Sequence, residues 1–155
     1  MASQKILGLF AGEKTGGQEV FEEVPVEDLG RGRFRVTSSP GFVEGIASGD
    51  IIRLSLEIRG RFEVIERGGN VCIQVYGDSV IDQIQLGFGH LIEQLGGWLD
   101  DKGSQVMVYT VPISAGFPAI EKVMAGIVNA FPGVVWSYGN VYDAKDGETP
   151  LNWWR

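Results

Sequence analysis

The spacing of apolar residues changes near residue 70, and this change constrains the fold more strongly than any motif in the chain. Before it, short runs that alternate between apolar and polar residues are separated by glycine-rich turns such as Gly30-Arg31-Gly32. After it, apolar residues recur at helical spacing in two segments, each flanked by strand-like runs rich in β-branched residues. Strands followed by mixed helices and strands predict an α+β fold.

The first part of the chain, residues 1–69, has the pattern of a series of short antiparallel strands. The expected strands are Lys5–Ala11, Glu19–Leu29, Arg33–Thr37, Ile51–Ile58 and Arg61–Glu66. The glycine-rich segment 40–47 is too short for a stable helix, so it predicts a tight loop or one helical turn. Short strands joined by frequent turns predict a small β-barrel or a meander.

Residues 70–143 alternate strands with helices. The expected elements are a strand at Val71–Tyr76, a helix capped by Asp78 or Ser79 that ends near Leu95, strands at Trp98–Asp100 and Gln105–Val111, a helix at Ile120–Phe131 and a strand at Val134–Tyr142. This order predicts a ferredoxin-like βαββαβ unit. Residues 144–155 are expected to form a polar C-terminal tail that ends in two adjacent tryptophans.

The charge balance limits the partners that the protein can bind. Twenty acidic residues against 13 basic ones give a net charge of −7, which opposes binding to nucleic acid or to an anionic membrane. The same charge favours a basic protein partner through electrostatic steering. The single Cys72 excludes an internal disulfide and a cysteine-based metal cluster, so neither a metal nor a cofactor is expected. Because no signal sequence or long apolar run is evident, the chain is expected to be cytoplasmic.

A glycine-rich motif links two of the expected strands between Phe34 and Ile52. It comprises an aromatic-Arg strand, a Pro-x-Phe-Val turn at residues 40–43 and a Gly-x-Ala-x-Gly-Asp segment that ends at Asp50. The pattern resembles the signature of a widespread bacterial family of small proteins without an assigned function, over roughly residues 24–135. The later Gly68-Gly69-Asn70 run departs from the Ser-Gly-His of many family members, so no role of that histidine carries over. The resemblance implies a fold but no activity.

The residue types of this motif have structural reasons to be there. Pro40 restricts the backbone, and Gly45 and Gly49 allow conformations that other residues avoid. Asp50 is expected to cap the turn through its carboxylate; the alternative is a catalytic acid, for which no partner is evident. The residues expected to fill one end of the barrel are Phe42, Val43 and Ile46.

No set of catalytic residues stands out in the sequence. His90, the only histidine, falls opposite the apolar stripe of its expected helix and should face solvent. Cys72 is expected on the strand face away from the helices, as a buried and unreactive thiol, because no neighbouring cation that would activate it is evident. These residues therefore indicate no particular enzymatic activity.

One face of the second sheet is expected to be free of helices. The residues assigned to it are Cys72, Tyr76, Met107, Tyr109 and either Trp136 with Tyr138 or their neighbours. Aromatic residues on such a face stack bases in RNA-recognition folds, but here the net charge is wrong and the basic aromatic strand motif is absent. The face is therefore expected to pack against the first half of the chain or against a second copy, which keeps a homodimer as an alternative.

The first functional hypothesis is a non-enzymatic protein-binding module, most specifically an acidic immunity or antitoxin protein that occludes the active site of a basic bacterial toxin. It follows from the small size, the acidity and the lack of a catalytic set. The expected contact residues are Glu19, Glu22, Glu23, Glu27, Asp28, Trp153 and Trp154. The alternative for the acidic residues is a solvated strand edge, and for the tryptophans it is a tail folded back onto the body.

The second functional hypothesis places a small-molecule site, or the active site of an enzyme, in the groove between the two halves. The residues assigned to this site are Asp50, Asn70, Cys72 and Tyr109. A groove between two packed halves is a common position for a ligand.

Overall fold

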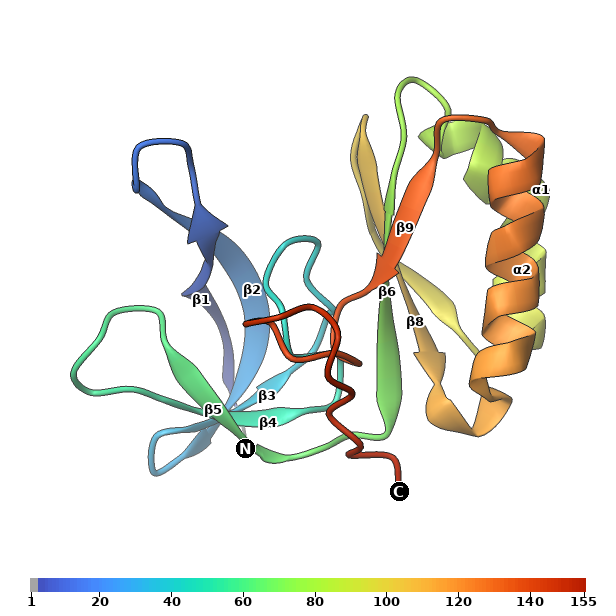
Figure 1. Cartoon of the computed structure of the whole chain (residues 1–155). Helices are drawn as coiled ribbons and strands as arrows, with labels where there is room; N and C mark the ends of the chain where they lie inside the picture. Colours follow the sequence, from blue (N-terminus) through green and yellow to red (C-terminus); the bar gives the residue numbers. More distant parts are fainter. Residues whose placement is uncertain (1–2) are drawn as a thin grey trace.

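The computed structural model describes residues 3–155; Met1 and Ala2, which belong to the first expected segment, lie outside the described residues. Two antiparallel sheets and two α-helices form a mixed α+β fold, which confirms the expected class (Figure 1). The first sheet contains β1 (Ser3–Glu13), β2 (Glu19–Gly30), β3 (Arg33–Val36), β4 (Ile51–Leu54) and β5 (Phe62–Glu66). The second half contains β6 (Asn70–Tyr76), α1 (Ile81–Gln94), β7 (Trp98–Lys102), β8 (Val106–Pro112), the 3₁₀ turn η1 (Ile113–Ala115), α2 (Phe117–Ala130) and β9 (Val135–Tyr138).

The first sheet is a meander in which each strand pairs with the next one along the chain. A closed barrel would need a hydrogen-bonded ladder between the first and last strands. In the described chain the first and last strands are not paired; β1 meets the turn before β5 through the N–H of Phe10, which donates to the carbonyl of Gly60 at 3.0 Å. The meander is therefore confirmed and the closed barrel was wrong.

The second sheet has the strand order β7-β8-β6-β9, and every neighbouring pair is antiparallel. Both helices cover the face that points away from the first sheet, as Figure 1 shows. Val71, Ile73 and Val75 alternate toward this face and share a core with Ile84 of α1 and Met124 of α2. No helix within residues 3–155 is long and apolar enough to cross a membrane.

The opposite face of the second sheet is covered by the connection between β3 and β4, residues 37–50, which we call the signature loop. Ala47 of this loop packs with Cys72 and Val108 of the sheet in a small buried cluster. The side-chain amide of Gln74 donates to the carbonyl of Pro40 at 3.1 Å. This face of the sheet therefore packs against the first half of the chain, which was one of the two predicted alternatives; the other was packing against a second copy of the chain.

Two residues assigned to the signature-loop face lie on the helix face instead. They are Met107 and Tyr109. On β9, Trp136 and Tyr138 also face the helices, which confirms the second of the two alternatives, that their neighbours face the loop. Residues paired directly across an antiparallel ladder point to the same side, and Tyr109 pairs with Ile73, whereas Cys72 pairs with Thr110. The sequence shows the alternation within each strand but not the register between strands, which is why the assignment of Met107 and Tyr109 was wrong.

The signature loop is a tight loop without a helix, and only part of it fills the first core as expected. Val43 and Ile46 are fully buried there, but Phe42 has a side chain that is 51% exposed. The chain bends here so that the N–H groups of residues 41, 42 and 43 all reach Glu22, and the ring of Phe42 lies beside Tyr76, with ring centres 6.2 Å apart. The expectation for Phe42 was wrong.

Several element boundaries also differ from the expected ones; β9, for example, ends at Tyr138 rather than at Tyr142, and α2 begins at Phe117 rather than at Ile120. Neither Asp78 nor Ser79 caps α1; the cap position is taken by Val80, after Ser79 adopts a left-handed backbone with a φ of 61°. β4 ends at Leu54 rather than at residue 58, because the Ser55 hydroxyl accepts the backbone N–H groups of the two residues that follow Leu56 and turns the chain.

Candidate functional site

Asp50 is buried where the signature loop returns to β4, and its carboxylate holds the loop closed. One oxygen accepts the backbone N–H of Ala47 at 3.0 Å, and the other accepts the N–H of Gly68 at 2.8 Å. The guanidinium of Arg67 lies 3.2 Å from the same carboxylate. Burial raises the pKa of Asp50, although the two N–H groups and Arg67 act in the opposite direction. This is the backbone-capping geometry that the motif predicts.

Arg67 joins the signature loop to the C-terminal tail. Its guanidinium pairs with Asp50, donates to the carbonyl of Gly45 at 2.8 Å and lies 5.6 Å from the ring of Trp153. Burial lowers the pKa of Arg67, and the charge of Asp50 opposes this effect. Since an arginine stays protonated at physiological pH, the pair is a structural clamp.

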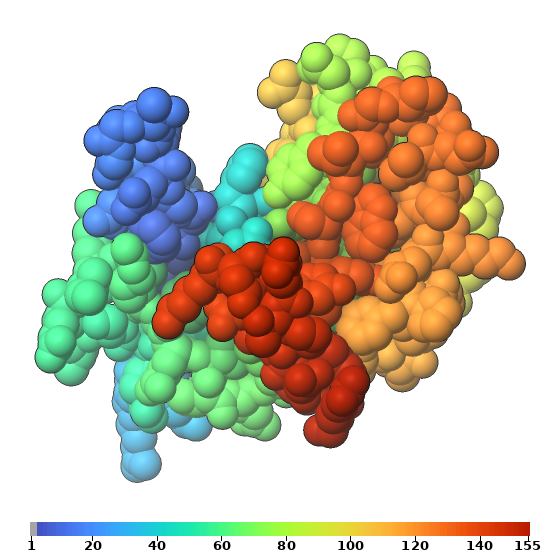
Figure 2. All heavy atoms as spheres, viewed as in Figure 1, coloured from blue at the N-terminus to red at the C-terminus, as the bar shows by residue number. Residues whose placement is uncertain are grey.

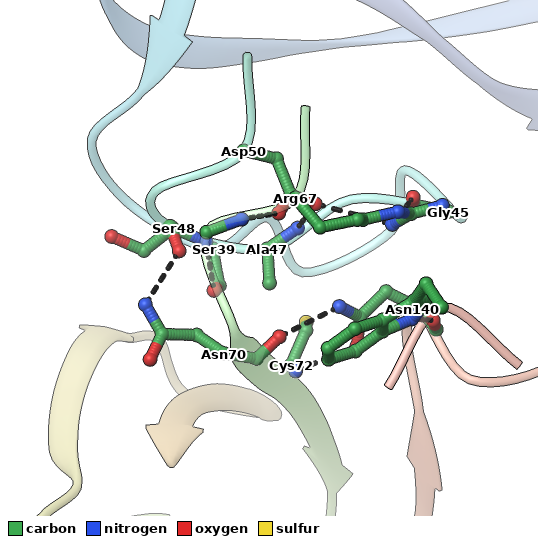
Figure 3. A network of polar contacts seen from close by, with 11 residues as sticks. Ser39, Gly45, Ala47, Ser48, Asp50, Arg67, Asn70, Cys72 and Asn140 are labelled. Carbon is green, nitrogen blue, oxygen red and sulfur yellow. Dashed lines mark hydrogen bonds and ion pairs between the residues drawn. The ribbon is translucent and has the colours of Figure 1, made fainter. Parts of the chain in front are cut away.

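Two asparagines complete this polar network (Figure 3). Asn70 donates to the carbonyl of Ser48 at 2.8 Å. The side chain of Asn140 accepts the N–H of Cys72 and donates to the carbonyl of Asn70, both at 2.9 Å. The backbone carbonyl of Asn140 accepts the indole N–H of Trp153 at 2.8 Å. Buried polar groups that are satisfied in this way fix the loop, the second sheet and the tail relative to one another.

The four residues assigned to a ligand site do not form one site. Asp50 and Asn70 are engaged in the network just described, and Cys72 beside them is fully buried. Burial raises the pKa of the Cys72 thiol well above its usual value, and nearby carboxylates add to this effect. Tyr109 lies on the helix face, where its hydroxyl donates to Gln85 of α1.

Most of the acidic residues assigned to partner binding on β2 have internal contacts. Glu22 accepts three backbone N–H groups of the signature loop, at residues 41, 42 and 43, within 2.9 Å. Glu27 pairs with Arg35 at 2.6 Å and Asp28 pairs with Lys5 at 2.8 Å; the remaining pair, between Glu19 and the Arg61 side chain, is longer at 3.5 Å. Glu19 and Glu23 are the two exposed residues among these five.

Neither His90 nor any cluster of metal-binding residues points to a reaction. His90 is exposed on α1, as expected. In the part of the chain that the structure describes, no group of three or more His, Cys, Asp or Glu side chains is placed to hold a metal ion.

A hollow of about 590 Å³ lies where the signature loop, β9 and the start of the C-terminal tail meet. Its lining residues are Glu44, Glu121, Trp136, Ser137, Tyr138, Tyr142, Asp143, Ala144 and Gly147. β9 is an edge strand of the second sheet, so the hollow adjoins a strand that has a neighbour on one side only. Figure 2 shows the C-terminal tail lying across the junction of the two halves. Both halves of the chain therefore contribute to this hollow.

The charged groups that line the hollow are carboxylates. Within residues 3–155, neither Glu44 nor Glu121 lies within 4.0 Å of a lysine or arginine nitrogen. The Glu44 side chain is exposed to solvent on one side, but the protein atoms packed around the rest of it desolvate the carboxylate and raise its pKa to about 7. The Tyr138 hydroxyl donates to Glu121 at 2.9 Å, and burial together with this bond raises the pKa of Tyr138. A cation bound in the hollow would stabilise the ionised form of these carboxylates.

The two C-terminal tryptophans pack against the body of the protein, as one of the alternatives predicted. Trp154 meets the ring of Phe117 edge-on, with ring centres 5.1 Å apart, and Trp153 lies 5.4 Å from Trp154. Trp154 also lines a smaller hollow of about 210 Å³ that shares three lining residues with the first one and ends at Arg155. Of the residues expected to contact a partner, Trp154 is thus the one beside the hollow.

The sequence interpretation missed the residues of this hollow. Glu44 carried a signal, because it is the only charged residue of the signature loop between Thr37 and Gly49. A charged side chain that a loop does not need for its own conformation is a candidate for function. Glu121, Trp136 and Tyr142 carried no such signal, because only the tertiary structure brings α2, β9 and the tail together.

The fold and this hollow define a small two-sheet α+β protein with a binding-sized concavity between its halves. The chain belongs to the family described as Domain of unknown function (DUF4265), whose model matches residues 22–131. This confirms the resemblance to an uncharacterised family. A solved structure, that of a hypothetical protein from Neisseria gonorrhoeae, is similar with a TM-score of 0.66 and 15% sequence identity, over 90% of this chain and 94% of that chain. At this identity the likeness concerns the fold alone. No curated protein matches the sequence.

Proposed function

We propose that this protein is a binding module that receives a basic segment of a partner protein in the hollow beside β9. The observation that carries the proposal is the lining of that hollow, in which every charged side chain is a carboxylate. The net charge of −7 adds a long-range attraction for a basic partner. The free side of β9 offers backbone groups to an extended segment of that partner.

The most specific form of the proposal is a cytoplasmic immunity or antitoxin protein that covers the active site of a basic toxin. The contact set then changes from the one that the sequence indicated. Trp154 remains in it, Glu44 and Glu121 join it, and Glu22 leaves it because this side chain anchors the signature loop; Glu23 is exposed but does not line the hollow.

The test is to co-express the chain with the protein encoded by the adjacent gene. We expect that neighbour to arrest growth alone, to be neutralised by this chain and to form a complex with it in size-exclusion chromatography. A neighbour that is harmless, or that does not bind, would remove the immunity form of the proposal. Glu93→Gln is a suitable control variant for Glu44→Gln and Glu121→Gln, because Glu93 is an exposed carboxylate of α1 outside the hollow.

The second candidate is a small-molecule-binding protein or an enzyme that uses the same hollow. It is favoured by the volume of about 590 Å³, which falls in the range of roughly 300–1,000 Å³ typical of ligand pockets. The residues first assigned to such a site, Asp50, Asn70 and Cys72, do not line this hollow. A ligand-dependent rise in melting temperature across a panel of metabolites, lost in Trp136→Ala, would support this candidate.

We also propose that residues 70–143 form a ferredoxin-like unit. The support is the strand order β9-β6-β8-β7 with both helices on one face, which is the order of two interleaved β-α-β units. Right-handed crossovers at both helices in an experimental structure would establish it, and a left-handed crossover would contradict it.

A further inference from the structure

The hollow beside β9 combines the two kinds of side chain that recognise an organic cation. Trp136 and Tyr138 meet at 88° with ring centres 4.9 Å apart, and Tyr142 lines the same hollow with 39% of its surface exposed. Aromatic faces attract cations through the ring quadrupole, and tryptophan does so most strongly. A cation that binds against aromatic rings loses water on that side, which strengthens its interaction with carboxylates nearby.

The carboxylates of the hollow complement these aromatic rings. Glu44 enters from the signature loop, Glu121 from α2 and Asp143 from the start of the tail. The backbone N–H of Lys145 is directed at the Asp143 carboxylate at 2.9 Å, and Glu121 accepts the hydroxyl of Tyr138. For Glu44 the described residues provide neither a hydrogen-bond donor nor an ion pair. Glu44 is thus the carboxylate whose charge the chain itself leaves uncompensated.

We propose that this hollow is a guanidinium-binding site, which holds an arginine side chain of the partner between the aromatic walls of Trp136 and Tyr142 and the carboxylates of Glu44 and Glu121. This inference rests on the proposed function in one respect: the arginine is supplied by the basic partner protein proposed above. It assigns to the site a ligand chemistry that neither the family nor the similar structure specifies.

A guanidinium fits this lining better than an ammonium group does. It is planar, it is weakly hydrated, it stacks on aromatic rings and it forms paired hydrogen bonds with a carboxylate. An ammonium group is a compact and strongly hydrated charge, which loses more hydration when it binds against aromatic rings. The volume of about 590 Å³ leaves room for the residues on either side of the arginine.

Binding of a cation is coupled to the protonation of Glu44. Burial raises the pKa of Glu44 to about 7, so near neutral pH a part of the population carries a proton there. A bound guanidinium favours the ionised carboxylate and therefore releases that proton. The other titratable groups that face Glu44 are Glu121, Asp143, Tyr138 and Tyr142 around the hollow, with Tyr76 and Cys72 behind the loop. Affinity should accordingly rise between pH 6 and pH 8, a window around the pKa of about 7.

The test uses the full chain and a capped peptide, acetyl-Gly-Arg-Gly-amide, measured by isothermal titration calorimetry and by NMR of the tryptophan indole N–H groups. We expect saturable binding of the arginine peptide, no binding of the corresponding glutamine peptide, and weaker binding of the lysine peptide. Glu44→Gln and Glu121→Gln should each reduce the affinity about tenfold, as loss of a charge-assisted contact does. Glu93→Gln removes the same charge outside the hollow and should leave the affinity unchanged.

Three results would overturn the inference: no binding of the arginine peptide, equal affinity in Glu44→Gln and wild type, or a lysine peptide that binds as tightly as the arginine peptide. A Trp136→Phe variant identifies the indole signal that should shift, which gives a readout even where a glutamate variant is unstable. The peptide contains no part of a natural partner. If the protein binds the peptide but no partner protein, the guanidinium site is supported and the proposed function is contradicted. If it binds a partner protein but not the peptide, the proposed function is supported and the guanidinium site is contradicted.

Discussion

Gly49 and Gly68 lie so close together that a Cβ on Gly68 would be 2.5 Å from the carbonyl carbon of Gly49. This contact is where the link between β5 and β6 crosses the end of the signature loop. On either side of it, the N–H of Gly68 binds Asp50, and the side chain of Asn70 binds the carbonyl of Ser48. The close approach of two glycines therefore allows the buried carboxylate to reach its donors.

Gly68→Ala should destabilise the protein by about 1–3 kcal/mol, because the added methyl group meets backbone that cannot move without breaking the Asp50 contacts. Gly8→Ala is the matched control, since a Cβ at Gly8 has no neighbour within 4 Å. The measurement is the free energy of unfolding from urea titration. Equal stability of the two variants would mean that the Gly49–Gly68 contact does not constrain the fold.

Asp50→Ala should lower the free energy of unfolding by about 3–5 kcal/mol, as removal of one partner of a buried ion pair typically does. It leaves the guanidinium of Arg67 and two backbone N–H groups without their acceptor. Glu63→Ala breaks an exposed pair with Arg53 at 3.5 Å and should cost less than about 1 kcal/mol. If the two substitutions had similar effects on urea denaturation, the carboxylate of Asp50 would not hold the loop.

The sequence predicted the elements of this fold well and their mutual placement poorly, for a physical reason. Alternation and helical spacing are local properties, so the strands, both helices and the capping role of Asp50 followed from neighbouring residues. The side of the sheet that Tyr109 occupies depends on register between strands, which tertiary packing sets. Glu22 looked like one more surface charge in an acidic run, but its carboxylate holds a loop about twenty residues away in sequence.

The candidate site was harder to predict than the fold for the same reason. Its residues come from the signature loop, α2, β9 and the tail, and no spacing in the sequence connects them. The acidic composition did predict the sign of the charge that lines the hollow. The residues that carry this charge, Glu44 and Glu121, could be identified only after the loop and the helix were placed side by side.

Cys72 should be unreactive toward a thiol reagent in the folded protein. Its side chain is fully buried, burial raises its pKa, and Gly139 passes so close that a Cβ there would be 2.6 Å from the sulfur. We expect labelling by Ellman's reagent at pH 8 to be slow in buffer and to reach one thiol per chain rapidly in concentrated urea. Rapid labelling of the native protein would show an accessible thiolate, which would contradict this prediction and make Cys72 a candidate catalytic nucleophile.

Glu44 should make the stability of the protein depend on pH in the opposite sense from an ordinary ion-paired carboxylate. Its pKa is raised from 4.5 in the unfolded chain to about 7 in the folded one, with burial as the cause. Between these pH values the folded chain retains a proton that the unfolded chain releases, so raising the pH favours unfolding. The stabilising contribution is complete below pH 4.5, declines as the pH rises through about 7 and is absent above it.

Glu44→Gln isolates this contribution, because glutamine is neutral in both states and every other titratable group around the hollow is retained. The free energy of unfolding of the wild type, measured relative to that of Glu44→Gln, should fall from pH 4.5 to about pH 7 and then stay constant. Glu93→Gln controls for the loss of one negative charge from the chain and should not reproduce this change of slope. Parallel stability curves for wild type and Glu44→Gln would show that Glu44 is ionised at neutral pH as freely in the folded protein as in the unfolded one. The arginine peptide would then displace no proton from Glu44, and its affinity would not change between pH 6 and pH 8, a window around the pKa of about 7.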